Sequence, residues 1–236
     1  MTELLQTLKN NLHFVGFCLC IFAAVLILAV LAQRFLIRQR RPLPAARRIS
    51  FVAVFAAFSA VLMFLEIPVF FVPSFYKLDV SELPVLICAF YLGPVAGVVC
   101  ELIKVLLFTL LHGTTSAFVG EFANFAVGCA FVLPAAVIYG CTKTKKGALI
   151  ALLCGTLVLT VFGSLFNAWY LLPKFSELYG LPLDAIIAMG SELNPAVRDL
   201  YTFAAFAVAP FNLLKGLIDT VLTFLLYKRV SRLFSK

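Results

Sequence analysis

The stretch Ala209–Asp219, APFNLLKGLID, places an asparagine, a lysine and an aspartate inside an apolar run that extends over residues 201–227. A run of this length is long enough to cross the hydrocarbon core of a bilayer as a helix, which takes about 20 residues. A charge near the bilayer centre costs about 2.5–3.5 kcal/mol on insertion scales, so such residues usually face a cavity, a ligand or one another. The stretch therefore predicts a membrane helix with a polar site inside its span.

The composition of the whole chain indicates the same class. Of its 236 residues, 63% are hydrophobic and 13% are charged, and the mean hydropathy is +1.07, which is typical of an integral membrane protein. The third and fourth apolar segments are short, and Gly93-Pro94 between them predicts a tight turn. We expect an all-α integral membrane protein whose seven helices are Phe14–Ala32, Ile49–Leu65, Val85–Leu92, Val95–Leu111, Phe122–Cys141, Ala148–Leu172 and Tyr201–Tyr227.

Charge is distributed unevenly among the connections between these helices. The basic connections carry Arg34, Arg38, Arg40, Arg41, Arg47, Arg48, Lys143, Lys145, Lys146, Lys228, Arg229, Arg232 and Lys236. The alternate connections carry most of the acidic residues, namely Glu66, Asp79, Glu82, Glu177, Asp184, Glu192 and Asp199. The positive-inside rule then predicts a multi-pass protein of the cell membrane with its N-terminus outside and its C-terminus in the cytoplasm. This alternation accounts for the net charge of +8 without a nucleic-acid partner.

The first apolar segment has some features of a signal peptide, with Ala32 at a small-residue position. However, its amino end is hardly basic, its apolar run is long and arginines follow it, which is a stop-transfer pattern. We therefore expect an extra N-terminal transmembrane helix within residues 1–36, a basic cytoplasmic linker at 37–48 containing RQRRPLPAARR, and a six-helix substrate-binding membrane domain at 49–232.

Motifs for catalysis and metal binding are absent from the sequence. There is no GxxxxGK[ST] phosphate-binding loop, so the chain is not expected to hydrolyse ATP by itself. It contains no HExxH or GxSxG motif, and its seven cysteines form no CxxC. We expect no catalytic residues, no metal and no cofactor, although an intramembrane enzyme built from widely separated residues remains an alternative.

Polar residues at membrane depth are the strongest functional signal. Asn167 and Asn124 lie near the outer ends of their helices, with Glu121 close to Asn124, whereas Asn212 lies about 16 Å into the last helix. We expect a polar cluster that opens outward. Amides and a lysine supply both donors and acceptors, which suits a ligand with carbonyl oxygens and ring nitrogens, and Lys215 lies on the same helix face as Asn212.

Other interpretations of these residues remain open. Asn212 serves equally well as a hydrogen-bonding contact between helices. Pairs three or four residues apart can neutralise each other, as Glu101 with Lys104 or Lys215 with Asp219. Aromatic residues near the outer surface suit either the walls of a ligand site or an aromatic belt at the membrane interface; these are Phe75, Tyr76, Trp169 and Tyr170.

The second apolar segment carries small residues at a spacing of four. In ISFVAVFAAFSA, the pairs are Ala53 with Ala57 and Ala56 with Ala60. Small residues at this spacing allow another helix to approach closely. That helix belongs either to a partner subunit or to the chain itself.

Three longer motifs carry a resemblance to a known family. FYKLDVSELPVLICAFYLGPVAGVVCELIKVLLF, GEFANFAVGCAFVLPAAVIYG and PFNLLKG occur in this order. Together they resemble the riboflavin-binding S components, the RibU family, of energy-coupling-factor (ECF) transporters, over roughly residues 47–232. The helix before Arg34 departs from the six-helix core of that family.

The resemblance implies a membrane protein that captures riboflavin from outside as a transported ligand. It implies three protein partners, a transmembrane coupling subunit and two cytoplasmic ATPase subunits, which would explain the missing phosphate loop. It also implies that the alanine pairs Ala53, Ala57, Ala56 and Ala60 face the coupling subunit. With the polar residues that open the fifth helix, the candidate substrate-binding residues are Phe75, Lys77, Leu78, Asp79, Glu121, Asn124, Asn167, Asn212 and Lys215.

Two kinds of alternative function are left. One is an S component for another vitamin, such as thiamin, folate or pantothenate. Cationic thiamin would sit poorly against Lys215 unless Asp219 neutralised that lysine, and folate would favour further cations for its two carboxylates. The other alternative is the intramembrane enzyme.

Overall fold

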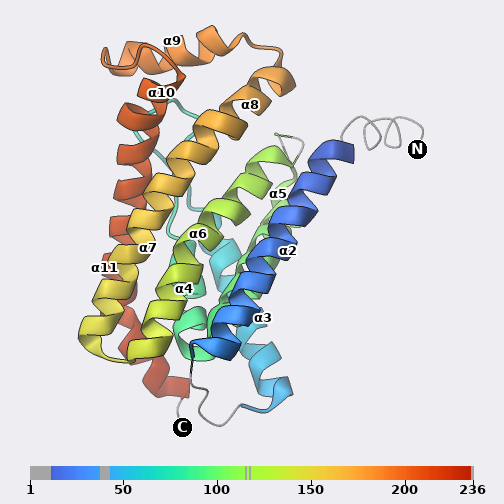
Figure 1. Ribbon diagram of the computed structural model, residues 1–236, viewed down its shortest axis with the longest axis vertical. Coiled ribbons are helices and arrows are strands. Elements are labelled where there is room, and N and C mark those ends of the chain that lie inside the picture. The colour runs from blue at the N-terminus through green and yellow to red at the C-terminus, as the bar shows by residue number, and fades with distance from the viewer. Residues whose placement is uncertain (1–11, 38–42, 115, 117, 235–236) are drawn as a thin grey trace.

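The computed structural model describes residues 12–37, 43–114, 116 and 118–234. Residues 1–11 of the predicted N-terminal segment, positions 38–42 of the predicted linker with Arg38, Arg40 and Arg41, and the terminal Lys236 lie outside this part. Figure 1 shows the described helices as an elongated bundle. The α-helices are α2 (Leu12–Phe35), α3 (Ala45–Met63), α4 (Glu82–Leu92), α5 (Pro94–His112), α6 (Val119–Thr142), α7 (Lys145–Phe166), α8 (Leu172–Tyr179), α9 (Leu183–Leu193), α10 (Leu200–Phe203) and α11 (Ala209–Phe234).

Two π-helical segments join α-helices into longer continuous helices. The segment η1 (Asn167–Leu171) links α7 to α8, and η2 (Ala204–Val208) links α10 to α11. The strands β1 (Ile67–Pro68) and β2 (Lys77–Leu78) pair in an antiparallel ribbon within the connection from α3 to α4.

Within the described residues, six helices are long and apolar enough to cross a membrane. They are α2, α3, α5, α6, the continuous helix 145–179 and the continuous helix 200–230, and α4 is a shorter apolar helix. The expectation of an all-α membrane protein is therefore confirmed. Helices dominate because the bilayer core offers no water to satisfy backbone N–H and C=O groups, and a helix satisfies them internally.

The turn between α4 and α5 has the predicted form. Gly93 has a φ of 101°, in the left-handed region that favours glycine, and Pro94 begins α5. A Cβ atom at Gly93 would lie 2.9 Å from Oε1 of Gln33 on α2. A side chain at position 93 would therefore be strained and would also crowd the first helix.

The core of the bundle is formed by α3, α4, α5, α6, α7 and α11. Its buried side chains include Phe55 of α3, Leu86 of α4, Phe131 of α6 and Leu152 of α7. The first helix, α2, lies along one side of this core (Figure 1). It contacts α5 and α6 through a cluster that contains Ala29, while much of its apolar surface remains exposed.

One end of the bundle carries a cap of short helices, α8, α9 and α10 (Figure 1). No helix was predicted over α9. Gly190 on α9 allows close packing, since a Cβ atom there would lie 2.6 Å from a ring carbon of Phe203. The connection from α3 to α4, residues 64–81, packs under this cap, with Val72, Tyr76 and Leu78 buried beside Phe203. We call this connection the entry loop.

Candidate functional site

The entry loop is joined to α11 by a buried ion pair. Lys215 Nζ on α11 donates to Asp79 Oδ2 of the loop at 2.8 Å. The other oxygen of Asp79 accepts a hydrogen bond from the backbone N–H of Ser81 at 2.9 Å, which fixes the orientation of the carboxylate. Burial by itself would raise the pKa of Asp79, but the charges of Lys215 and Lys104 and these hydrogen bonds lower it to about 2. The carboxylate is therefore ionised at neutral pH.

A second contact joins the entry loop to the end of α7. Tyr76 Oη donates to Asn167 Oδ1 at 2.6 Å, and both side chains are buried. The amide of Asn167 in turn donates through Nδ2 to the carbonyl of Gly163 at 2.7 Å. Burial raises the pKa of Tyr76, so its hydroxyl keeps its proton and acts as a donor. Asn167 is the first residue of η1, and π-helical turns of this kind often occur at functional sites.

Asn212 and Asn167 both lie against Gly163. A Cβ atom at Gly163 would lie 2.6 Å from Asn212 Nδ2, so only glycine leaves room for this amide. Asn212 is 5% exposed, and within the described part its Nδ2 has no hydrogen-bond partner. A buried donor without a partner costs about 1–3 kcal/mol. An acceptor placed within reach of this amide would satisfy it.

A second buried lysine forms a different kind of cluster. Lys104 Nζ on α5 lies 2.6 Å from Glu101 Oε1 and 2.8 Å from Glu82 Oε1, and donates to Ser81 Oγ at 3.3 Å. All three charged side chains are at most 2% exposed. We call Glu82, Glu101 and Lys104 the Lys104 cluster. Gly128 on α6 makes room for it, because a Cβ atom there would lie 2.2 Å from Glu101 Oε1.

The ion pairs of Lys104 and Lys215 can be compared with the pairs expected from sequence spacing. The pairing of Glu101 with Lys104 is confirmed. The assignment of Glu82 to an outer connection was wrong, because Glu82 begins α4 and is buried against Lys104. Lys215 pairs with Asp79 rather than Asp219. Both carboxylate oxygens of Asp219 are buried and lack a hydrogen-bond partner among the described residues.

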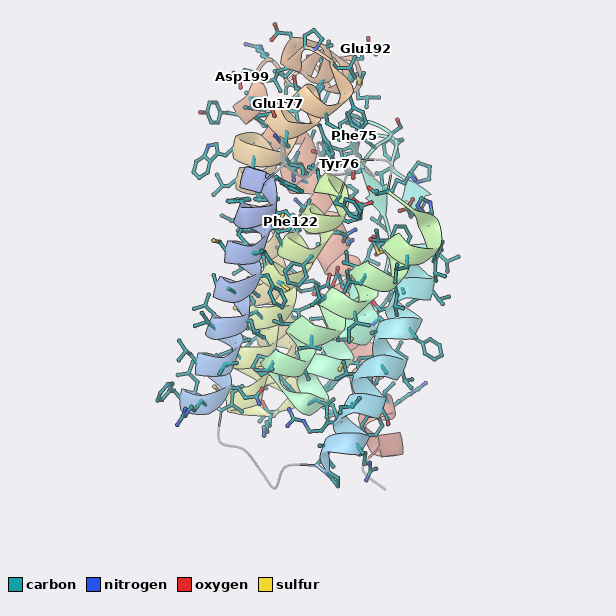
Figure 2. All side chains as sticks on the ribbon, turned by 90° about the vertical axis from the view of Figure 1, so that its right-hand side faces the viewer. Phe75, Tyr76, Phe122, Glu177, Glu192 and Asp199 are labelled. Carbon is teal, nitrogen blue, oxygen red and sulfur yellow. The ribbon has the colours of Figure 1, made fainter. Side chains whose placement is uncertain are left out.

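The remaining predicted binding residues differ in how exposed they are. Leu78 is buried in the cluster under the cap, whereas Phe75 is exposed, with its ring centroid 4.7 Å from that of Tyr76. Figure 2 shows Phe75 and Tyr76 near the cap end that carries Glu177, Glu192 and Asp199. Lys77 points away from the site, because it is half exposed and pairs with Glu66.

On α6, the two predicted residues, Glu121 and Asn124, make no hydrogen bond to Lys215 or Asp79 among the described residues. Glu121 Oε2 accepts a hydrogen bond from Ser116 Oγ at 2.8 Å, and Asn124 is half-buried. Trp169 is 67% exposed, which suits a position at the membrane interface. Tyr170 stacks on Phe17 of α2, with ring centroids 4.5 Å apart.

The alanines of α3 divide between two faces. Ala53 and Ala57 are exposed, next to the exposed side chain of Phe58. Ala56 and Ala60 are at most 2% exposed and lie in the interior of the bundle. In this arrangement, Ala53 and Ala57 are available to another chain, while Ala56 and Ala60 serve packing within this one.

Two features of the candidate site were missed from the sequence. Tyr76 was considered only as part of an aromatic wall and not for its hydroxyl, and Gly163 was not considered as a site residue. The glycine had a detectable signal, since it lies four residues before Asn167 in GSLFN and therefore on the same helix face. Among the described residues, no group of three or more His, Cys, Asp or Glu side chains is arranged to hold a metal ion.

Comparison with known proteins places this arrangement in a family. The family model described as ECF transporter, substrate-specific component, matches residues 47–227. The riboflavin transporter RibU of Staphylococcus aureus (strain TCH60) is 31% identical over 199 residues, which cover 84% of this chain and 98% of that protein. The riboflavin transporter FmnP of Bacillus subtilis (strain 168) is 30% identical over 184 residues, which cover 77% and 90%.

A solved structure has a similar fold. The S component of a bacterial ECF transporter superposes with a TM-score of 0.64 and 30% sequence identity, covering 82% of this chain and all of that one. The helix α2 precedes the residues that the family model matches.

Proposed function

The chain belongs to the substrate-specific components of ECF transporters, and on this basis we propose that it captures riboflavin from outside the cell for ATP-driven uptake. The similar proteins from Staphylococcus aureus and Bacillus subtilis are named riboflavin transporters. The observation that carries the proposal is the unpaired, buried amide of Asn212 beside Asn167 and Lys215.

The chemistry of riboflavin matches these groups. Its isoalloxazine ring is planar and uncharged and carries carbonyl oxygens and ring nitrogens. Asn212 Nδ2 and the Lys215 ammonium supply donors for carbonyl oxygens, and Asn167 Oδ1 supplies an acceptor. In the structure, Asn167 Oδ1 already accepts a hydrogen bond from Tyr76 of the entry loop, and Lys215 already donates one to Asp79 of that loop. A ligand in this site exchanges contacts with the loop, and the loop then lies over the ligand.

The charge of the site favours a neutral ligand over the other vitamins. Asp79 is the counter-charge of Lys215, and Glu82 and Glu101 engage Lys104. An anion at Lys215 would therefore compete with Asp79 and leave two negative charges for one cation. Folate and pantothenate bring carboxylates that need such a cation, and thiamin brings a positive charge next to Lys215. Riboflavin is the one candidate among these that requires no further charge.

We propose that energy comes from partner subunits, a transmembrane coupling subunit and two cytoplasmic ATPases, and that this chain performs no catalysis. Ala53 and Ala57 form the exposed small-residue contact for the coupling subunit. The proposed orientation places the cap outside. The cap end carries Glu177, Glu192 and Asp199 (Figure 2), whereas α6 and α7 meet at Lys143, Lys145 and Lys146. A thiol introduced at Lys145 should resist labelling by impermeant reagents on intact cells.

Ligand identity is tested with the purified chain. Riboflavin, thiamin, folate and pantothenate are each titrated against it, with quenching of flavin fluorescence as the direct signal and competition as the signal for the other three. We expect saturable binding of riboflavin at one site and no displacement by the other vitamins. Displacement by any of them at equal concentration would contradict the assignment to riboflavin.

A further inference from the structure

A cavity of about 330 Å³ lies at the end of the bundle opposite the cap, and Asn212 is not among the residues that line it. It lies where α2 ends, α3 begins, α4 meets α5 and α6 ends. The side chains important for its chemistry are Gln33, Ile37, Arg48, Tyr139 and Lys143.

The helix α2, which lies outside the family match, builds one wall of this cavity. Gln33 Oε1 accepts a hydrogen bond from the backbone N–H of Val95, at the start of α5, at 3.3 Å. Ile37, two residues after the end of α2, is 9% exposed and packs against Gly140, where a Cβ atom would lie 2.6 Å from Ile37 Cδ1. The cavity therefore forms by docking of α2 onto the six-helix core.

The cavity has an uncompensated positive charge. Arg48 comes from α3 and Lys143 from the end of α6, and no carboxylate lines the cavity among the described residues. Neither cation takes part in an ion pair between described residues. Gly93, at the amino end of α5, also lines the cavity, so the positive end of that helix dipole adds to the field.

The other walls are apolar or aromatic. Ile37 and Leu92 are aliphatic, and the ring of Tyr139 stacks on that of Phe90, with centroids 4.2 Å apart. An anionic group with attached hydrocarbon fits this combination of cations and apolar walls. Basic pockets between transmembrane helices on the cytoplasmic side are known to hold lipid headgroups.

We propose that this cavity binds a phosphate group, and that its occupant is the headgroup of an anionic phospholipid. The proposed orientation assigns that lipid to the inner leaflet, whereas the binding itself depends only on the cavity. Lipid at this position bridges α2 to α3 and α6, and so holds the extra helix against the core.

The test uses the full chain in a neutral detergent. Phosphatidylglycerol or zwitterionic phosphatidylcholine is added, and retained lipid is counted by native mass spectrometry beside the thermal unfolding midpoint. We expect the wild type to retain phosphatidylglycerol in preference to phosphatidylcholine. Replacing both cations, as Arg48→Gln with Lys143→Gln, should weaken the apparent affinity for phosphatidylglycerol about 30-fold at low salt.

The matched control is Lys145→Gln with Lys146→Gln, which removes two charges from the same end but outside the cavity. Retention should be nearly unchanged in this control. Equal losses in both double variants would assign the effect to general surface charge and overturn the proposal. The single variants Arg48→Gln and Lys143→Gln, measured without lipid, show whether folding is preserved.

A parallel titration with inorganic phosphate distinguishes the two sources of the anion. Stabilisation by phosphatidylglycerol alone supports the lipid. Stabilisation by millimolar inorganic phosphate that depends on Arg48 and Lys143 supports a phosphate site but assigns it to a soluble anion. The proposal is contradicted if the chain shows no preference for anionic over zwitterionic lipid and does not respond to phosphate.

Discussion

Two buried lysines in this bundle have different surroundings, and the difference separates structure from function. Lys104 is held by two carboxylates, Glu82 and Glu101, that both belong to helices. Lys215 is held by one carboxylate, Asp79, from the entry loop, and it lies one turn of α11 from the unpaired amide of Asn212. A lysine paired within helices stabilises the fold. A lysine paired to a loop can exchange that partner if the loop moves, and we propose that riboflavin takes the place of Asp79 at Lys215.

The largest effect is expected at Lys104. The change Lys104→Met leaves Glu82 and Glu101 buried without a counter-charge, which costs about 3–5 kcal/mol for a broken buried pair. We expect a large drop in the thermal unfolding midpoint and in the yield of folded protein. The control Lys174→Met removes a partly exposed lysine paired with Glu177 and should be nearly neutral. If the Lys104 variant is as stable as the wild type, Lys104 does not stabilise the fold, and the proposed difference between the two lysines is wrong.

The binding site should respond mainly in affinity. In Asn212→Ala and Lys215→Ala, the ligand loses a hydrogen-bond partner in a buried site, at about 1–3 kcal/mol, so riboflavin affinity should fall roughly 5- to 150-fold. Flavin-fluorescence titration measures the change, with Lys174→Ala as the matched control. If both variants bind like the wild type, Asn212 and Lys215 act as contacts between helices and the ligand lies elsewhere.

The alanines of α3 allow the same comparison on one helix, because Ala56 is buried in the core and Ala57 is exposed. Ala56→Leu inserts a larger side chain into the core and should destabilise the protein by about 1–3 kcal/mol. Ala57→Leu projects from the exposed face, so it should abolish uptake in cells that express the partner subunits while riboflavin binding stays intact. A parallel loss of binding and uptake in Ala57→Leu would instead assign that face to folding of this chain.

The smallest effect concerns pH. Asp79 has a pKa of about 2 in the folded protein, below the ordinary value of 3.8. Its stabilising contribution is therefore complete above about pH 4 and is lost as the pH falls toward 2. Riboflavin affinity should be nearly constant from pH 5 to 8. The same titration on Asp79→Asn, which lacks this carboxylate, provides the reference. A marked change near pH 6 would show that another group controls the entry loop.

Much of the fold was predictable because membranes impose strong local rules. The apolar runs, the Gly93-Pro94 turn and the pair Glu101–Lys104 follow from composition and from spacing along one chain segment. The short helix α9 was not predicted, because it is amphipathic and lies in a connection that carries Asp184 and Glu192. Its place in the fold comes from packing on Phe203.

The sequence by itself determined that this is a multi-helix membrane protein with Asn212 and Lys215 on one face of its last helix. Only the tertiary structure decided that Lys215 pairs with Asp79, 136 positions away, and that Glu82 joins Lys104. Helical periodicity reports neighbours within one helix, whereas these contacts depend on how a loop docks between helices. The same limit applies to α3, where spacing identified both alanine pairs and only packing showed which pair is exposed.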